Sequence, residues 1–289
     1  MGPGMTQHST QASKPNTDDL RIREIKELVP PAHVFREYPV SNRAAQTTFV
    51  ARQAIHRILH GADDRLLVEA IPLRSLQIST GSHTVALTAR LNEPGLPPVT
   101  LAALIDAAER YDLAPAIDRR LIDAAVEALA RAKRRGRNLH CLLPLSRSSI
   151  SSRETADYIA RSLASHNLSG ERLCLVFSED ILTHLTSQAM EFSRQMHMLG
   201  CTVGLEDFGG GLSSFSHLRS ISPSHVKLSR SLTRDLGGTR ASTALLRAVQ
   251  EITSDLHIHT IAEDVDDQET LDQLRDLGID FAQGKAVAP

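Results

Sequence analysis

Two adjacent carboxylates are the residues of this chain best placed to do chemistry. Glu206 and Asp207 end the short apolar run 203–205, and small residues follow them closely: Gly209, Gly210, Gly211, Ser213 and Ser214. Neighbouring carboxylates repel each other, and a hard divalent cation with its preference for oxygen ligands would relieve that repulsion. The glycines would let the backbone approach a phosphate closely. The alternative interpretation is a solvated acidic turn between a strand and a helix.

The elements that must position these residues alternate between strand and helix after residue 65. Strand-like apolar runs occur at 66–73, 83–91, 139–143, 172–177, 201–205, 225–228, 258–261 and 279–282. Helix-like runs occur at 100–110, 114–134, 152–166, 181–199, 213–219, 240–256 and 267–277. This alternation predicts an α/β fold, a (β/α)8 barrel, with a doubly wound open sheet as the alternative. In a barrel, Glu206 and Asp207 would lie at the carboxyl ends of the strands, where chemistry collects.

Composition narrows the class of protein and of partner. The 289 residues carry a net charge of -2, no Trp and only 3% aromatic residues, which argues against a nucleic-acid partner. No apolar run has membrane-spanning length, so we expect no membrane association. The three cysteines, Cys141, Cys174 and Cys201, lie in strand-like runs and are predicted to be reduced thiols of a cytoplasmic protein.

The first 64 residues differ from the barrel region. Residues 1–17 are polar, without periodicity, and are predicted to be a disordered tail. Residues 18–64 form a predicted helical arm. The stretch TDDLRIREIKELVPPAHVFREYPVSNRAAQTTFVARQAIHRILHGADDRLLV, residues 17–68, resembles the N-terminal extension of class I DAHP synthases. The resemblance ends there, because that family continues with a Gly-Pro-Cys-Ser turn and this chain does not. It implies an arm for subunit contacts and regulation without the chemistry.

A second resemblance covers residues 66–289, within the barrel domain predicted over 65–289. The stretch GLEDFGGGLSSFSHLRSISPSHVKLSRSL, the blocks IAEDVD at 261–266 and DFAQG at 280–284, and the segment 98–118 together resemble the EAL family of cyclic di-GMP phosphodiesterases. The resemblance implies an EAL-type (β/α)8 barrel. It also implies metal-assisted hydrolysis of cyclic di-GMP to pGpG, in which Mg²⁺ or Mn²⁺ activates a water.

Only part of the family's site residues is present. By the resemblance, the remaining metal ligands are Glu206, Asp207 and Glu263, with Glu179 as a further candidate, and Lys227 is the catalytic lysine. The ligand-binding positions implied are Gln283, Gly209, Gly210, Gly211, Ser213 and Ser214. Three positions that hold oxygen ligands in the family carry none here, and our alignment places them at Val85, Pro144 and Val176.

We therefore predict a degenerate, catalytically inactive EAL protein that acts as a cyclic di-GMP effector or a protein-interaction module. Two alternatives stay open. One is a weak phosphodiesterase that uses Mg²⁺ or Mn²⁺. The other is a regulatory or assembly partner of a DAHP synthase, or the product of a chimeric gene. A protein partner and a homodimer are compatible with each.

Overall fold

The computed structural model describes residues 66–77, 83–92, 98–210, 214–234, 236 and 240–287. The predicted tail 1–17 and arm 18–64 lie outside these residues. The described strands are β1 (Leu66–Ser75), β2 (His83–Leu91), β3 (Val99–Thr100), β4 (Leu139–Pro144), β5 (Leu173–Ser178), β6 (Thr202–Phe208), β7 (His225–Leu228), β8 (His259–Ala262) and β9 (Phe281–Ala282). Eight of them close into a barrel in the order β1-β9-β8-β7-β6-β5-β4-β2, because β1 also pairs with β2, and β3 extends the sheet beyond β2. The predicted barrel is confirmed.

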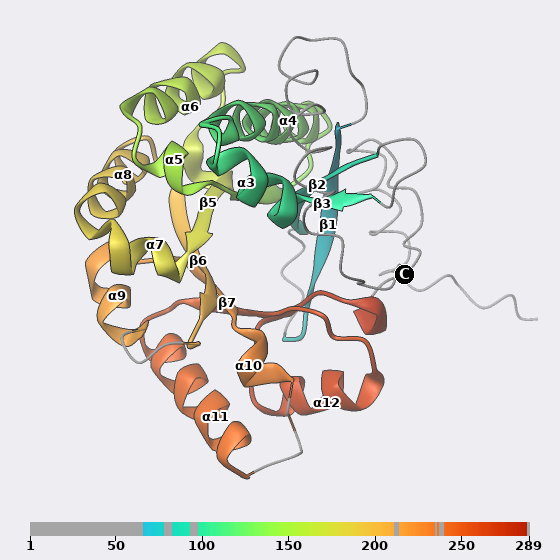
Figure 1. The fold of residues 1–289 in the computed structure, drawn as a ribbon. Helices are drawn as coiled ribbons and strands as arrows, with labels where there is room; N and C mark the ends of the chain where they lie inside the picture. Colours follow the sequence, from blue (N-terminus) through green and yellow to red (C-terminus); the bar gives the residue numbers. More distant parts are fainter. Residues whose placement is uncertain are drawn as a thin grey trace, which may run out of the picture.

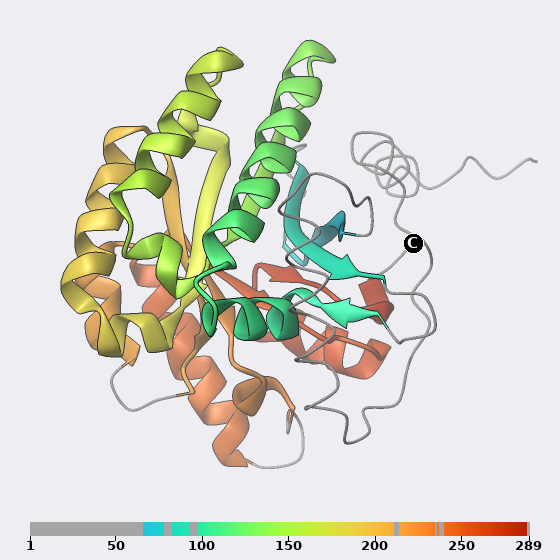
Figure 2. The same ribbon diagram turned by 45° about the horizontal axis from the view of Figure 1, so that its top comes forward.

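Helices surround the strands on the outside (Figure 1). They are α3 (Leu101–Glu109), α4 (Ala114–Arg134), α5 (Arg147–Ile150), α6 (Arg153–Ser165), α7 (Glu179–His184), α8 (Thr186–Met198), α9 (Ser214–Ile221), α10 (Arg230–Thr233), α11 (Arg240–Asp255) and α12 (Gln268–Asp276). Figure 2 shows the two long helices α4 and α6 running side by side over the strands. Among the described residues, no helix is both long enough and apolar enough to cross a bilayer.

One strand departs from the regular (β/α)8 pattern. β1 runs antiparallel to both of its neighbours, β2 and β9, whereas the other neighbouring strands around the barrel are parallel. Only seven residues separate Ser75 from His83. A parallel pair needs a crossover of a dozen or more residues, so a connection of this length favours the antiparallel arrangement. The single helix expected over 181–199 is instead two helices, α7 and α8, that meet at Leu185, whose backbone is not helical.

The core has two parts that follow from the alternation of side chains along each strand. A large outer cluster fills the space between strands and helices and includes Val85, Leu143 and Leu205. A small inner cluster fills the barrel lumen with Leu73, Ala86, Leu142, Cys174, Val176 and Ile261, against which Phe281 packs. Residues that alternate with the outer cluster therefore face the lumen. Those nearest the carboxyl ends of the parallel strands line the mouth of the barrel.

Candidate functional site

Lys227 is the central residue of the barrel mouth. It alternates along β7 with the outer-core residues Val226 and Leu228, and its ammonium lies between two carboxylates from the neighbouring strands. The Nζ atom donates to Glu206 Oε1 of β6 at 2.8 Å and lies 3.2 Å from Glu263 Oε1, just after β8. The lysine side chain is 9% exposed, and the glutamates are 29% and 30% exposed. The three groups form an ion-paired triad with a net charge of -1.

The two carboxylates keep Lys227 charged. Burial by itself would lower the pKa of Lys227, but the charges of Glu206 and Glu263 outweigh that effect, and hydrogen bonds to both add to them. The pKa of Lys227 therefore lies above its ordinary range. A permanently protonated lysine is a cation and a hydrogen-bond donor, and it cannot act as a general base near neutral pH.

The backbone separates Asp207 from this triad. A bulge interrupts the pairing of β6 with β7 between Leu205 and Phe208, and Asp207 has φ of 56°. Its side chain is exposed, while Glu206 points to Lys227. The same arrangement recurs after β8, where Asp264 follows Glu263 with φ of 55° and bonds Arg230 at 2.5 Å. In both pairs the aspartate has a left-handed backbone conformation. Its carboxylate therefore points away from the lumen side, where the preceding glutamate lies.

Glu179, the further metal candidate, holds the glycine loop. Its carboxylate is 7% exposed and accepts from the Gly209 N–H at 3.3 Å, and it lies 3.3 Å from His217 Nδ1 on α9. Gly209 has φ of 84°, a left-handed conformation that favours glycine, and a Cβ there would also require the end of the Leu232 side chain to move. The predicted residues Gly211 and Ser213 lie outside the described residues. Ser214 begins α9, and Gly210 closes the described part of the loop.

Of the three positions predicted to have lost an oxygen ligand, the one on β2 needs a correction. Pro144 and Val176 alternate with outer-core residues and face the lumen, Val176 as a member of the inner cluster. Val85 instead lies in the outer cluster at 0% exposure, between β2 and the helices, and its neighbour Ala86 lies in the inner cluster. A shift of one residue along a strand moves a side chain to the other face, so the position on β2 that faces the lumen is Ala86.

Gln283 is a further lumen residue that bears on ligand binding. Gln283 continues the lumen-facing side of β9, and its Oε1 is buried with no hydrogen-bond partner among the described residues. A buried carbonyl oxygen in that state favours a donor from a ligand or a water.

An ion pair joins Glu69 of β1 to Arg90 of β2 at 2.8 Å, and the sequence analysis missed it. The available signal was a carboxylate and a guanidinium on consecutive apolar strands.

The donor set at the mouth does not fit a divalent metal ion. Mg²⁺ requires near-ideal octahedral coordination by six oxygens, usually one or two protein carboxylates together with waters and substrate phosphates. Lys227 already occupies the space between the two lumen carboxylates, and Asp207 is turned away from them. Over the part of the chain that the structure describes, no three His, Cys, Asp or Glu side chains are grouped to hold one ion. The structure therefore does not bring the predicted ligands Glu206, Asp207, Glu263 and Glu179 together.

A buried carboxylate next to the mouth should give the protein a measurable pH dependence. Asp118 of α4 is 1% exposed and accepts from the Ser146 N–H at 3.0 Å and from its hydroxyl at 2.5 Å, which orders the turn after β4. Burial raises the pKa of Asp118 to about 6, although the hydrogen bonds from Ser146 and Ser149 oppose it. The contribution of the protonated Asp118 to the free energy of unfolding is fully present below about pH 4. It is lost as pH rises through about 6.

We expect the free energy of unfolding of the wild type, relative to Asp118→Asn, to fall by about 2 kcal/mol between pH 4 and pH 7. Urea denaturation of both proteins across this range measures the difference. Asp123→Asn is the matched control, because Asp123 lies on the same helix and accepts a hydrogen bond from the Tyr158 hydroxyl at 2.7 Å. Parallel curves for the wild type and Asp118→Asn would show that the carboxyl titrates in its ordinary range.

Comparison with known proteins identifies the family to which this barrel is similar. The EAL domain family matches residues 72–289. The cyclic di-GMP phosphodiesterase PdeB of Shewanella oneidensis is 29% identical over 226 residues, which are 78% of this chain and 26% of that protein. The chain thus spans about a quarter of the length of that relative. A Phe-sensitive phospho-2-dehydro-3-deoxyheptonate aldolase of Escherichia coli is 59% identical over 51 residues, 18% of this chain and 15% of the aldolase, which is consistent with the predicted arm.

A solved structure agrees with the sequence match. The EAL domain of Xanthomonas citri FimX, crystallised in complex with c-diGMP, superposes with a TM-score of 0.75 at 30% identity and covers 86% of this chain and 96% of that one. The FimX EAL domain of Pseudomonas aeruginosa also gives a TM-score of 0.75, at 21% identity, and supports the fold. The family match covers more than half of the chain, the fold agrees with it, and the chain belongs to the EAL domain family.

Proposed function

We propose that this protein is a catalytically inactive EAL domain that binds cyclic di-GMP at the barrel mouth without a divalent metal. It would act as an effector that passes the binding event to a protein partner. The observation that supports this most directly is the lysine between the two lumen carboxylates. Lys227 pairs with both Glu206 and Glu263, so the chain itself supplies one of the two positive charges that these carboxylates require, and a metal ion would gain less from them.

The missing ligands support the same proposal. Hydrolysis by a metal-bound water requires several oxygen ligands that hold the ion in a defined place. Ala86, Pro144 and Val176 offer no side-chain oxygen at these positions of β2, β4 and β5. The remaining acidic groups lie on β6 and after β8, where Lys227 pairs with them.

Binding of the nucleotide does not need the missing ligands. The unpartnered Gln283 Oε1 offers an acceptor to a base N–H. Lys227 remains a cation at the floor of the mouth, and Arg230 lies at its rim in a pair with Asp264. The FimX EAL domain at 30% identity, which was crystallised with c-diGMP, makes the same ligand the first candidate here.

The decisive experiment is calorimetric titration with cyclic di-GMP, with and without Mg²⁺ or Mn²⁺, followed by an assay for pGpG. We expect binding of similar affinity in both conditions and no pGpG. Gln283→Leu should weaken binding about tenfold, because the ligand donor loses its partner in a buried setting. Gln268→Leu, at an exposed glutamine of α12, is the matched control.

Two other results of this experiment would each support a different function. Metal-dependent production of pGpG that disappears in Asp207→Asn would establish the weak phosphodiesterase and contradict our proposal. Absence of binding in every condition would leave the mouth as a structural ion-paired relic and would favour a protein partner alone.

The 51-residue match to the aldolase supports a separate assembly role for the predicted arm. We propose that the arm mediates subunit contacts, either with a second copy or with an enzyme that carries a related arm. Comparison of the full chain with a protein lacking residues 1–64 by sedimentation velocity tests this role. An identical oligomeric state of the two proteins, with and without the related enzyme, would contradict it.

A further inference from the structure

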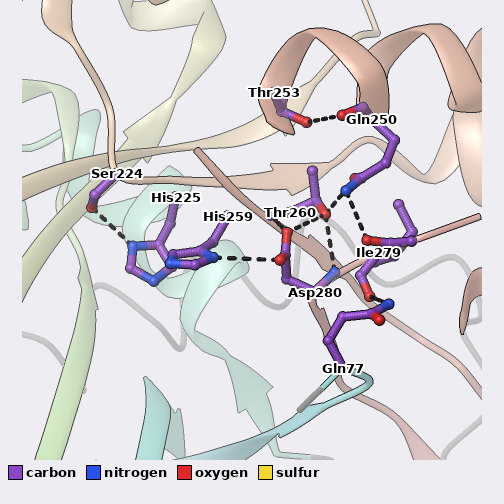
Figure 3. A network of polar contacts seen from close by, with 10 residues as sticks. Gln77, Ser224, His225, Gln250, Thr253, His259, Thr260, Ile279 and Asp280 are labelled. Carbon is purple, nitrogen blue, oxygen red and sulfur yellow. Dashed lines mark hydrogen bonds and ion pairs between the residues drawn. The ribbon is translucent and has the colours of Figure 1, made fainter. Parts of the chain in front are cut away.

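The end of the barrel opposite the mouth carries a pair of histidines. His225 begins β7, His259 begins β8, and the two residues are direct partners in the parallel ladder. Both alternate with outer-core residues and so face the lumen side, where Phe281 packs against their rings at centroid distances of 6.3 and 5.7 Å. Figure 3 shows the two imidazoles next to each other, between Ser224 on one side and Asp280 on the other.

Each imidazole is held through its Nδ1 atom. Ser224 Oγ lies 2.8 Å from His225 Nδ1 and 3.2 Å from the carbonyl oxygen of Val203, to which the hydroxyl donates. The serine hydroxyl has a single proton, so it accepts from the Nδ1–H of His225, and the Nε2 lone pair of that ring remains available. Asp280 Oδ1 lies 3.5 Å from His259 Nδ1, which orients the second ring in the same manner.

The carboxylate that orients His259 is itself fixed. Asp280 Oδ2 accepts from the Thr260 N–H at 2.8 Å and lies 3.0 Å from the Thr260 hydroxyl oxygen, whose single proton is donated either to it or to Gln250 Oε1 of α11 at 2.7 Å. Figure 3 follows this chain of contacts from α11 to the imidazole pair. An imidazole whose Nδ1 is bound to a carboxylate, with that carboxylate bound in turn, is the arrangement that orients histidine ligands in metal sites.

The spacing of the rings fits one shared ion. Imidazole nitrogens bind Zn²⁺ at about 2.0–2.1 Å in tetrahedral geometry, which puts the centroids of two bound rings about 5 Å apart. The centroids of His225 and His259 are 5.3 Å apart, and the ring planes are inclined by 43°. We propose that Nε2 of His225 and Nε2 of His259 bind a single imidazole-preferring transition-metal ion, of which Zn²⁺ is the representative, at the base of the barrel.

Two protein ligands define the character of this site. The histidine pair supplies two protein ligands, and water would fill the remaining coordination positions. The His259 side chain is 54% exposed, so solvent and an ion reach the pair from outside. The ion would join β7 to β8 at the end opposite Lys227, and it would stabilise the folded chain by binding to it in preference to the unfolded chain. The site is separate from the nucleotide chemistry proposed for the mouth.

The test is titration of the full chain with Zn²⁺ in a calorimeter and with Co²⁺ by visible absorption, which reports coordination geometry. We expect one ion to bind with histidine coordination and the melting temperature to rise with Zn²⁺ concentration. His259→Ala should abolish this binding, and its exposed side chain makes loss of folding from the substitution small. Asp280→Asn should weaken binding about tenfold or more, since it removes the group that orients the ring.

The chain supplies its own control. His56 and His60 have the helical i, i+4 spacing that also suits metal binding, and they lie outside the described residues. The double variant His56→Asn, His60→Asn should retain the ion that His259→Ala loses. Binding that persists unchanged in His259→Ala, or a wild type that binds neither ion, would overturn the proposal. Circular dichroism of each variant without metal separates loss of the ligand from loss of the fold.

Discussion

Replacement of Lys227 by methionine should destabilise the protein by about 2 kcal/mol and should create affinity for a divalent cation. The substitution removes the ammonium that lies 2.8 Å from Glu206 and 3.2 Å from Glu263. Breaking a fully buried pair costs about 3–5 kcal/mol, and the cost is smaller here because water still reaches both carboxylates. Two carboxylates that face each other without a counter-ion are the natural ligands of a hard cation.

Urea denaturation of Lys227→Met with and without Mn²⁺ measures both effects. The triple variant Lys227→Met, Glu206→Gln, Glu263→Gln is the control, because it removes the repulsion along with the lysine and should recover most of the lost stability. It should show no response to Mn²⁺. If Lys227→Met is as stable as the wild type, the triad does not neutralise the mouth, and the main support for a metal-free site is lost.

Introduction of a carboxylate on β2 should have opposite consequences at two neighbouring positions. Val85→Glu places a charge in the outer core, where the side chain is 0% exposed between strands and helices. An unpaired charge there costs about 5 kcal/mol, enough to prevent folding of an ordinary domain. Ala86→Glu places the same group in the lumen, from which a long side chain can extend toward the water of the mouth. We expect roughly half the cost at Ala86.

Soluble yield and urea denaturation of the two variants test this difference. Val85→Leu and Ala86→Val, which keep each site apolar, control for volume alone. Equal destabilisation by the two glutamates would mean that β2 has no distinct lumen face. If Ala86→Glu combined with Val176→Glu gains Mn²⁺ affinity, the ligand positions implied by the EAL family are correctly placed at Ala86 and Val176.

The architecture was largely predictable because it depends on periodicity. The eight apolar runs expected after residue 65 correspond to the eight strands of the closed barrel, and the long helical runs correspond to α4, α8, α11 and α12. The direction of β1 was not predictable from apolar pattern, because an apolar strand looks the same in either direction. The short connection between β1 and β2 contained the information, through the minimum length of a parallel crossover.

The register of β2 shows the limit of motif alignment. Val85 and Ala86 are both apolar residues in a run where nearly every residue is buried, so the sequence does not distinguish the two faces. The pairing with β1 and β4 distinguishes them, since it sends Val85 to the helices and Ala86 to the lumen. Side chains of a strand alternate strictly, and an error of one residue exchanges the faces.

The amino-acid sequence alone established which groups are available to this protein. They are the carboxylates of Glu206 and Asp207, the glycine loop that follows them, and Lys227 on the next strand-like run. The early strands offer too few oxygen ligands. The folded barrel established which of them meet. It brings Lys227 between Glu206 and Glu263, turns Asp207 outward through a left-handed backbone, and assigns Glu179 to the loop. It also brings His225 next to His259. Such contacts arise from strand register and backbone conformation, which join residues far apart in the chain and leave no local pattern in it.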